Sequence, residues 1–221
     1  MTGTPKMKTT NRRALLAASG ALTALTLIGC GKQDDVVLST GEARGDNVMG
    51  DPNAPVTIIE YASITCPHCR AFHDQVFPEL KSRYIDTGQV RFVFREFPTA
   101  PSALAMAGFL MARCAPEDKY FDILGILFDR QNELIAAYQT GTAREEILKI
   151  AQPLGMSEAQ FDACVRNTAE IERIEQVVEN GYQEYNVNST PSFIIGGKTY
   201  AGEMPVERFV ELIDPLLGEN G

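Results

Sequence analysis

Apolar side chains recur along the chain with two different spacings, and the change of spacing marks the predicted elements. Alternating apolar positions over residues 89–97 predict a β-strand, and an apolar run over residues 56–61 predicts a second strand. Between them, residues 66–84 carry apolar side chains at helical spacing, so a helix is expected there, and Pro78 should kink it. The folded part of the chain is therefore expected to begin with a strand, a helix and a strand.

The next segment, residues 101–185, has no strand pattern and predicts several helices. Prolines and glycines divide it, and Ser157 with a glutamine three residues later has the spacing of a helix capping box. Two short apolar runs joined by Gly196-Gly197 predict a β-hairpin over residues 192–201, and residues 205–217 predict a closing helix. This order predicts an α/β layer architecture with a helical insertion.

The charge balance is acidic and argues against a nucleic-acid partner. The chain has 221 residues, 44% of them hydrophobic, which suits one large domain or a core with an insertion. It carries 20 Lys and Arg against 29 Asp and Glu, and four of the basic residues lie before Cys30, which leaves 16 against 29 in the rest. Phosphate contacts need clustered Lys and Arg, so the surplus of acids indicates only a soluble surface.

The first 29 residues have the pattern of an export signal. Basic residues end at Arg12-Arg13, and the uncharged, mostly apolar run over residues 14–28 is shorter than the roughly 20 residues of a membrane span. Leu27-Ile28-Gly29-Cys30 resembles the lipobox of bacterial lipoproteins, which would lipidate Cys30 and anchor the chain to a membrane, and residues 11–16 resemble a twin-arginine signal. An ordinary cleaved leader or a retained anchor is the alternative. The expected location is periplasmic or otherwise extracytoplasmic.

Cys66 and Cys69 form a Cys-x-x-Cys motif between the first predicted strand and its helix. Such a pair can bind a metal, form a structural disulfide or exchange disulfides with other thiols. A metal site is not expected, because a closed zinc site needs four ligands and the chain has two histidines. At a helix N-terminus, unpaired N–H groups and the macrodipole stabilise a thiolate on Cys66, to which His68 can add a positive charge or a hydrogen bond. Pro67 occupies a position that needs no N–H, so disulfide exchange is the favoured chemistry.

Glu60, six residues before the motif, is the candidate proton acceptor. Cys69 is expected to lie deeper than the first cysteine and to act as the resolving thiol, which must lose a proton before it attacks a mixed disulfide. A buried Glu60 with a raised pKa could accept that proton. The alternative is a carboxylate at a strand end that faces solvent, Arg91 or Arg95. His73, further along the helix, is expected only to lie on its surface or to pack.

Cys114 and Cys164 each lie on an apolar helical stripe. The stripes consist of Ala103, Ala107, Leu110 and Cys114 on one helix, and of Phe161, Cys164, Thr168, Ile171, Ile174 and Val178 on the other. Both cysteines are therefore expected to face inward and, in an oxidising compartment, to form a structural disulfide that contributes roughly 3–4 kcal/mol. Two buried free thiols are the alternative.

Two segments of the chain resemble one protein family. Residues 51–61 followed by Cys66-Pro67-His68-Cys69, and residues 187–198 around Thr190-Pro191, resemble the DsbA-like thiol:disulfide oxidoreductases of the thioredoxin superfamily. The resemblance covers residues 48–217 or thereabouts, and the second cysteine pair resembles an alphaproteobacterial branch of the family.

The resemblance implies a role for each residue of the site. Cys66 would be the nucleophile, Cys69 the resolving thiol and Glu60 the buried acid. The substrate backbone would bind beside Pro67, at the Thr190-Pro191 loop, where a cis peptide is implied.

The resemblance also implies the fold class, an α/β thioredoxin fold with an inserted helical domain. The expected parts are an export signal over residues 1–29, a tether over 30–47 with a short edge strand at 36–38, a thioredoxin-like core over 48–100 and 186–221, and the helical insertion over 101–185.

The expected function is that of an extracytoplasmic protein disulfide oxidoreductase that oxidises dithiols of exported proteins through a Cys66–Cys69 disulfide, without a cofactor. Its expected partners are thiols of unfolded exported proteins and, by family analogy, a quinone-linked disulfide oxidase in the membrane, and the chain is expected to be a monomer. An isomerase or a reductase is the alternative, because Thr190 stands where the best-known oxidases have valine. A lipoprotein chaperone or a metal-binding module without enzymatic activity is the hypothesis from a different class.

Overall fold

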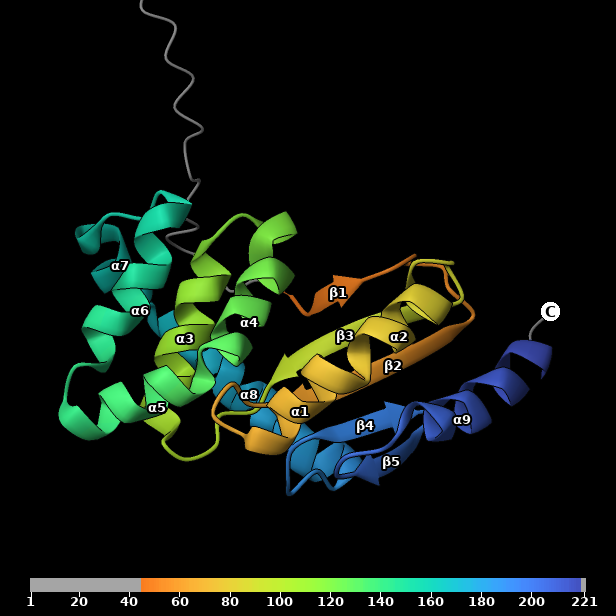
Figure 1. Ribbon diagram of the computed structural model, residues 1–221. Helices are drawn as coiled ribbons and strands as arrows, with labels where there is room; N and C mark the ends of the chain where they lie inside the picture. The colour runs from red at the N-terminus through yellow and green to blue at the C-terminus, as the bar shows by residue number, and fades with distance from the viewer. Residues whose placement is uncertain (1–44, 220–221) are drawn as a thin grey trace, which may run out of the picture. The chain divides into compact units, whose positions relative to one another are not determined.

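Figure 1 shows the structure of the protein, a computed structural model that describes residues 45–219. The predicted export signal, the lipobox with Cys30 and the edge strand expected at 36–38 lie outside the described residues. None of the helices in residues 45–219 has the length and the apolar character that a membrane span requires.

A five-stranded mixed sheet forms the centre of the described part (Figure 1). Its strands, in the order in which they lie side by side, are β1 (Asn47–Met49), β3 (Val90–Glu96), β2 (Val56–Ala62), β4 (Ser192–Ile195) and β5 (Lys198–Ala201). β2 and β3 are parallel, and the other neighbouring pairs are antiparallel. The predicted hairpin is confirmed, and it turns at Gly196 and Gly197, whose φ values of 55° and 74° favour glycine.

The helix expected after β2 is present, and it is interrupted close to Pro78 as predicted. α1 (Pro67–Gln75) ends before Val76, and a short α2 (Phe77–Leu80) and a π-helix (Lys81–Ile85) follow. Pro78 has no N–H to bond to the preceding turn, so the regular helix stops ahead of it. These helices form the crossover that the parallel pair β2 and β3 requires.

Between β3 and β4 the chain is helical, as the absence of a strand pattern predicts. The α-helices are α3 (Ser102–Cys114), α4 (Tyr120–Asp129), α5 (Gln131–Thr140), α6 (Ala143–Ala151), α7 (Glu158–Cys164) and α8 (Thr168–Tyr185). Ser157 and Gln160 form the predicted capping box at the start of α7. The closing helix predicted after the hairpin is α9 (Val206–Glu219).

One expected apolar stripe spans two helices instead of one. Asn167 caps α8 by accepting a hydrogen bond from an N–H of its first turn at 3.3 Å, so a new helix starts at Thr168, four residues after Cys164. Thr168 is therefore exposed, and Ala103 in the first turn of α3 is exposed as well, so neither faces inward as expected. The stripes are shorter than predicted, and they still place Cys114 and Cys164 in the interior.

Helices cover both faces of the sheet. On one face, Phe72 of α1 packs against Phe193 of β4 and Phe209 of α9, with ring centroids 4.7 and 5.6 Å away. On the other face, α8 packs against a separate buried cluster that contains Tyr61 of β2. The site described below lies on the face that α1 covers.

A buried network of charged side chains joins α3 and α8 to β3. Arg113 is completely buried, and it donates to Glu96 at 2.9 Å and to Glu170. Arg173 also donates to Glu96, and the Tyr120 hydroxyl donates to the same carboxylate at 2.9 Å. Burial opposes the charge of Glu96, but the guanidinium groups of Arg113 and Arg173 hold its pKa below the usual range. The helical segment is thus tied to the sheet by charge as well as by apolar packing.

Candidate active site

The Cys-x-x-Cys motif lies where β2 passes into α1 (Figure 1). Cys66 is the N-cap residue, with extended backbone at φ −87° and ψ 120°, and Pro67 is the first helical residue. Both cysteines are free thiols; Cys66 is 7% exposed and Cys69 is completely buried. The first thiol is therefore the more accessible one, as expected, although most of its surface is covered.

The Cys66 thiol is acidic for local reasons. The largest cause is a hydrogen bond from the Cys69 thiol, which lowers the pKa of Cys66. Burial acts in the opposite direction and raises this pKa. Hydrogen bonds from the side chain of Thr190 and from two backbone N–H groups lower it further, so the pKa falls to about 5. The N–H groups belong to residues 68 and 69, in the first turn of α1, where they have no partner within the helix. A free cysteine has a pKa of about 8.5, so Cys66 is a thiolate at neutral pH.

The imidazole of His68 is not among the main causes of this acidity. The side chain is 68% exposed, and its Nδ1 lies 3.3 Å from a carboxylate oxygen of Glu203. The support expected from the His68 ring therefore comes from its backbone N–H instead. Helix geometry explains the difference, because first-turn N–H groups point toward the N-cap residue while the side chain points outward.

Cys69 is held as a thiol. Burial raises its pKa well above that of a free cysteine, and its hydrogen bond to Cys66 and the negative charge of Glu60 raise it further. The backbone N–H of Ser63 lies 3.5 Å from its sulfur and acts in the opposite direction. The motif therefore combines one acidic thiol with one that needs a base before it can react.

Glu60 lies in the interior beside the motif. Side chains alternate along β2, so residues 58, 60 and 62 face α1, whereas residues 59 and 61 face α8. Glu60 is completely buried, in register with Phe94 of β3 and Phe193 of β4. The alternative of a solvent-facing carboxylate at a strand end is therefore wrong.

His73 is the neighbour of Glu60 that the sequence interpretation underestimates. Its Nε2 lies 2.9 Å from Oε2 of Glu60, and its side chain is only 9% exposed. Arg95, an alternative partner, is instead paired with Asp46 at 2.9 Å. His73 is thus a mostly buried polar partner and not a surface residue, and the other expectation, that it packs, is confirmed by its contact with Phe128. Its spacing is the signal that indicates this, because a helix returns to the same face four residues after Cys69.

The Thr190–Pro191 loop completes the site. Its peptide bond is cis, as the family resemblance implies. In its protonated form, the Cys66 thiol donates a hydrogen bond to the carbonyl oxygen of Thr190, 3.3 Å from its sulfur. Two motifs 124 residues apart in sequence therefore meet at one sulfur atom.

Gln131 connects the helical segment to the motif. It is 2% exposed, and its Nε2 donates to the carbonyl oxygens of Ile64 at 2.7 Å and of Cys66 at 2.9 Å. No sequence signal marks this residue, because a glutamine at the start of α5 has no characteristic spacing from the motif. A side chain of the helical segment thus holds the backbone on both sides of Thr65.

Cys114 of α3 and Cys164 of α7 are joined by a disulfide, with Cα atoms 6.0 Å apart. Both lie in the helical segment between β3 and β4, so this bond is separate from the motif. In the described part of the chain, no group of three or more His, Cys, Asp or Glu side chains is arranged to hold a metal ion.

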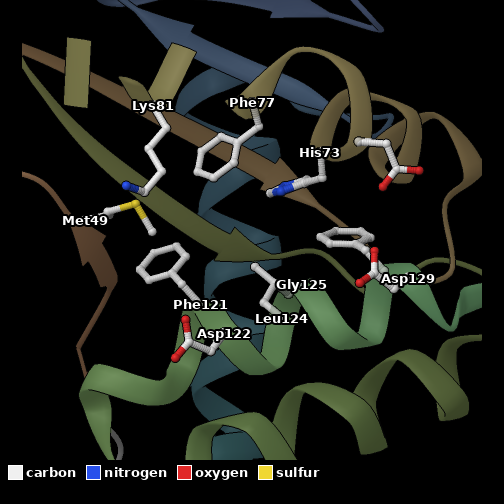
Figure 2. A pocket seen from close by; sticks show the side chains of 11 residues that line it. Met49, His73, Phe77, Lys81, Phe121, Asp122, Leu124, Gly125 and Asp129 are labelled. Carbon is white, nitrogen blue, oxygen red and sulfur yellow. The ribbon is translucent and has the colours of Figure 1, made fainter. Parts of the chain in front are cut away.

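Two hollows lie beside α1. One, of about 520 Å³, lies between α1 and the start of α9. Phe72, Met204 and Glu203 line it, and Glu203 is the partner of His68. The other, of about 220 Å³, lies between α1 and α4, and His73 is in its wall (Figure 2). The two hollows therefore adjoin different residues of the motif helix.

Comparisons with known proteins agree with this geometry. A family model described as Thioredoxin matches residues 42–215, a range that includes both motifs. A Rickettsia conorii protein that carries the name protein-disulfide oxidoreductase is 33% identical over 179 residues, which are 79% of this chain and 61% of that protein. The chain thus spans about three fifths of this relative's length. Disulfide bond formation protein D of Bacillus subtilis is 22% identical over 83% of this chain and 82% of that protein. The crystal structure of Wolbachia pipientis alpha-DsbA1 superimposes with a TM-score of 0.73 at 26% identity, over 85% of this chain and 96% of that chain.

Proposed function

Because the chain belongs to the thioredoxin family and is a DsbA-like member of it, we propose that it is an extracytoplasmic thiol:disulfide oxidoreductase that oxidises dithiols of exported proteins. The observation that carries the proposal is the division between the two thiols of the motif. Cys66 is acidic at a helix N-terminus, and Cys69 is buried with a raised pKa. A stabilised Cys66 thiolate favours the reduced form of the protein, which makes its Cys66–Cys69 disulfide an oxidant.

The proposed reaction has two exchange steps. A substrate thiolate attacks Sγ of Cys66 in the Cys66–Cys69 disulfide, so a mixed disulfide forms and Cys69 leaves with the electron pair and takes up a proton. A second thiolate of the substrate then attacks the substrate sulfur of the mixed disulfide, so the substrate disulfide forms and Cys66 leaves as a thiolate. The substrate loses two electrons and the protein gains them. Glu60 serves as the group that exchanges a proton with Cys69.

The substrate is proposed to bind across the Thr190–Pro191 loop and Pro67. The hollow beside Phe72 and Met204 adjoins the motif helix and offers an apolar surface for a chain that is not yet folded. Unfolded exported proteins are therefore the proposed substrates. A quinone-linked disulfide oxidase in the membrane, inferred from family analogy, would return the motif to its disulfide.

A chemical reason supports the proposal that the protein works outside the cytoplasm. The Cys114–Cys164 disulfide belongs to the kind of bond that persists in oxidising compartments. The proposed organisation is an export signal over residues 1–29, lipidation at Cys30, a tether that ends before β1, and a monomeric thioredoxin-like core that carries the helical insertion; the tether expected over residues 30–47 is corrected at its end, because Asn47 belongs to β1.

The proposal is tested with the two single serine variants of the motif. Cys69→Ser should accumulate a mixed disulfide between Cys66 and an unfolded substrate that carries a disulfide, because the Cys66 thiolate attacks that disulfide, displaces one substrate thiolate and is not resolved. Mass spectrometry detects the adduct, and Cys66→Ser should form none. Wild-type protein in the disulfide form should also restore disulfides to the reduced form of that substrate. If the wild type instead rescues a scrambled substrate efficiently in its reduced form and oxidises a reduced one slowly, the protein is an isomerase, the alternative that Thr190 favours. Absence of exchange in the wild type would contradict the whole proposal.

A further inference from the structure

The proposed exchange moves a proton at Cys69 in every cycle, and that proton has to travel between the interior and solvent. Cys69 and Glu60 are both completely buried. A proton that passes from Cys69 to Glu60 therefore remains inside the protein. Oε1 of Glu60 has no hydrogen-bond partner among the described residues, and Oε2 is hydrogen-bonded to His73. One oxygen of the carboxylate is therefore available to exchange a proton with Cys69 while the other contacts His73.

His73 connects Glu60 to the smaller hollow. Its Nε2 is 2.9 Å from Glu60, and its side chain lines the cavity of about 220 Å³. Figure 2 shows the His73 ring pointing from α1 into this cavity, with Phe121 and Asp122 of α4 across from it and Lys81 on its own side. The residual exposure of the side chain, 9%, places it between the buried carboxylate and the outside.

Aromatic side chains hold the imidazole in this position. The ring stacks on Phe128, with centroids 4.3 Å apart and an angle of 21°, and it also contacts Phe72 and Phe77 at 5.2 and 4.9 Å. Packing of this kind limits the ring to one orientation, in which Nε2 is directed at Glu60. An imidazole has two nitrogens, so it can accept a proton on one and release it from the other.

We propose that His73 relays the proton of Cys69 between Glu60 and the cavity beside α4. The inference rests on the proposed function and deepens it, and it makes His73 a positioning residue that acts through Glu60. When the Cys66–Cys69 disulfide is opened, Cys69 takes a proton from Glu60, and Glu60 is reprotonated through His73. When the disulfide is formed, the proton moves outward along the same groups.

Charged side chains on four elements face this route and will shape its pH dependence. Glu60 on β2 is in direct contact with the ring, and the cavity is lined by Asp74 on α1, Lys81 on the π-helix, and Asp122 and Asp129 on α4. The test therefore compares variants at one fixed pH and reads the Cys69 step directly.

The experiment follows the reaction of reduced protein with oxidised glutathione, quenched with acid and resolved by mass spectrometry. In the first step the Cys66 thiolate attacks glutathione disulfide, forms a Cys66–glutathione mixed disulfide and releases one glutathione thiolate. In the second step Cys69 gives up its proton, attacks Sγ of Cys66 and releases the other glutathione thiolate. His73→Ala should leave the first rate unchanged and slow the second by about 100-fold, the lower end of what positioned proton transfer contributes. The mixed disulfide should then accumulate.

A conservative variant separates proton transfer from hydrogen bonding. His73→Gln keeps an N–H donor for Glu60 but cannot relay a proton, so its second step should be as slow as that of His73→Ala. Added imidazole should restore the second step in His73→Ala, whose shortened side chain leaves the ring's place open to the cavity, and not in His73→Gln. His68→Ala is the matched control, because His68 is the other histidine of the chain. The second step of this variant should not respond to added imidazole.

The outcomes distinguish this inference from the proposed function. A normal second step in His73→Gln would overturn the relay, because a hydrogen bond alone would then suffice. Normal second steps in both variants, with wild-type exchange intact, would overturn it as well and leave the proposed function standing. If His73→Ala does not fold, as judged by thermal unfolding, His73→Gln alone decides between these results. A wild type that forms no mixed disulfide would instead overturn the proposed function.

Discussion

Lowering the pH should remove a stabilisation that only the reduced protein possesses. The pKa of Cys66 is about 5 in the folded state, and about 8.5 is the ordinary value for an unfolded chain. Because the folded-state value is the lower one, the ionised thiol stabilises the fold fully above about pH 8.5, and this contribution is lost as the pH falls to about 5. At about 1.36 kcal/mol per unit of pKa difference, the full contribution is roughly 5 kcal/mol. Of this, about 3.5 kcal/mol should disappear between about pH 8 and pH 5.

The assay is urea unfolding of the reduced and the oxidised protein across this pH range. Other titrating groups act equally in both forms, so the difference between the two free energies of unfolding isolates the motif. Cys69 stays protonated in the folded state within this range because its pKa is raised. Reduced Cys66→Ser is the control, and its stability should not show the additional pH dependence. A difference that is flat with pH, together with thiolate absorbance that titrates near the value of a free cysteine, would refute the reasoning and remove the oxidant hypothesis.

Three further substitutions test other parts of the structure. Replacing both Cys114 and Cys164 by serine should lower the free energy of unfolding, measured in urea, by roughly 3–4 kcal/mol, because their disulfide closes a loop of 50 residues. Dithiol oxidation should stay intact, because the bond is separate from the motif. Equal stability of the variant and the wild type would contradict this. Arg113→Met should lower the free energy of unfolding by about 3–5 kcal/mol, because two buried carboxylates lose a guanidinium partner. Arg144→Met, which removes an exposed ion pair, is the control and should lower it far less. Thr190→Val should raise the pKa of the first motif thiol, because a hydrogen bond from the threonine side chain helps to lower it; thiolate absorbance that titrates as in the wild type would show that the hydroxyl is not needed.

The parts of the site that the sequence predicts are those that depend on local geometry. Once the apolar run over residues 56–61 is taken as a strand, Glu60 must lie on the same face as Ile58, and a cysteine just before a helical pattern marks an N-terminus. The meeting of Cys66 with Thr190 has a different origin, because 124 residues separate them and no local pattern relates the two. That contact was expected only from the resemblance to a family.

The parts that sequence reasoning misses depend on which side chains meet across elements. His73 has helical spacing to Cys69, yet its value as a partner depends on Glu60 from a different element. The direction of the His68 ring is decided by Glu203, in the loop before α9. Arg113 looks like an ordinary charge in a helix, and its complete burial becomes reasonable only when Glu96 from β3 is placed beside it.

The contact of Gln131 with the backbone around Thr65 bears on how this protein can be re-engineered. One amide nitrogen on α5 satisfies two carbonyl oxygens, one of which belongs to the reactive cysteine itself. A minimal core made by cutting out the helices between β3 and β4 would lose that donor, and the turn that presents Cys66 would lose its restraint. Chimaeras that exchange these helices between relatives therefore need an amide side chain at the first position of α5. The helices between β3 and β4 are therefore not an independent module, because the side chain of Gln131 joins them to the backbone of the motif.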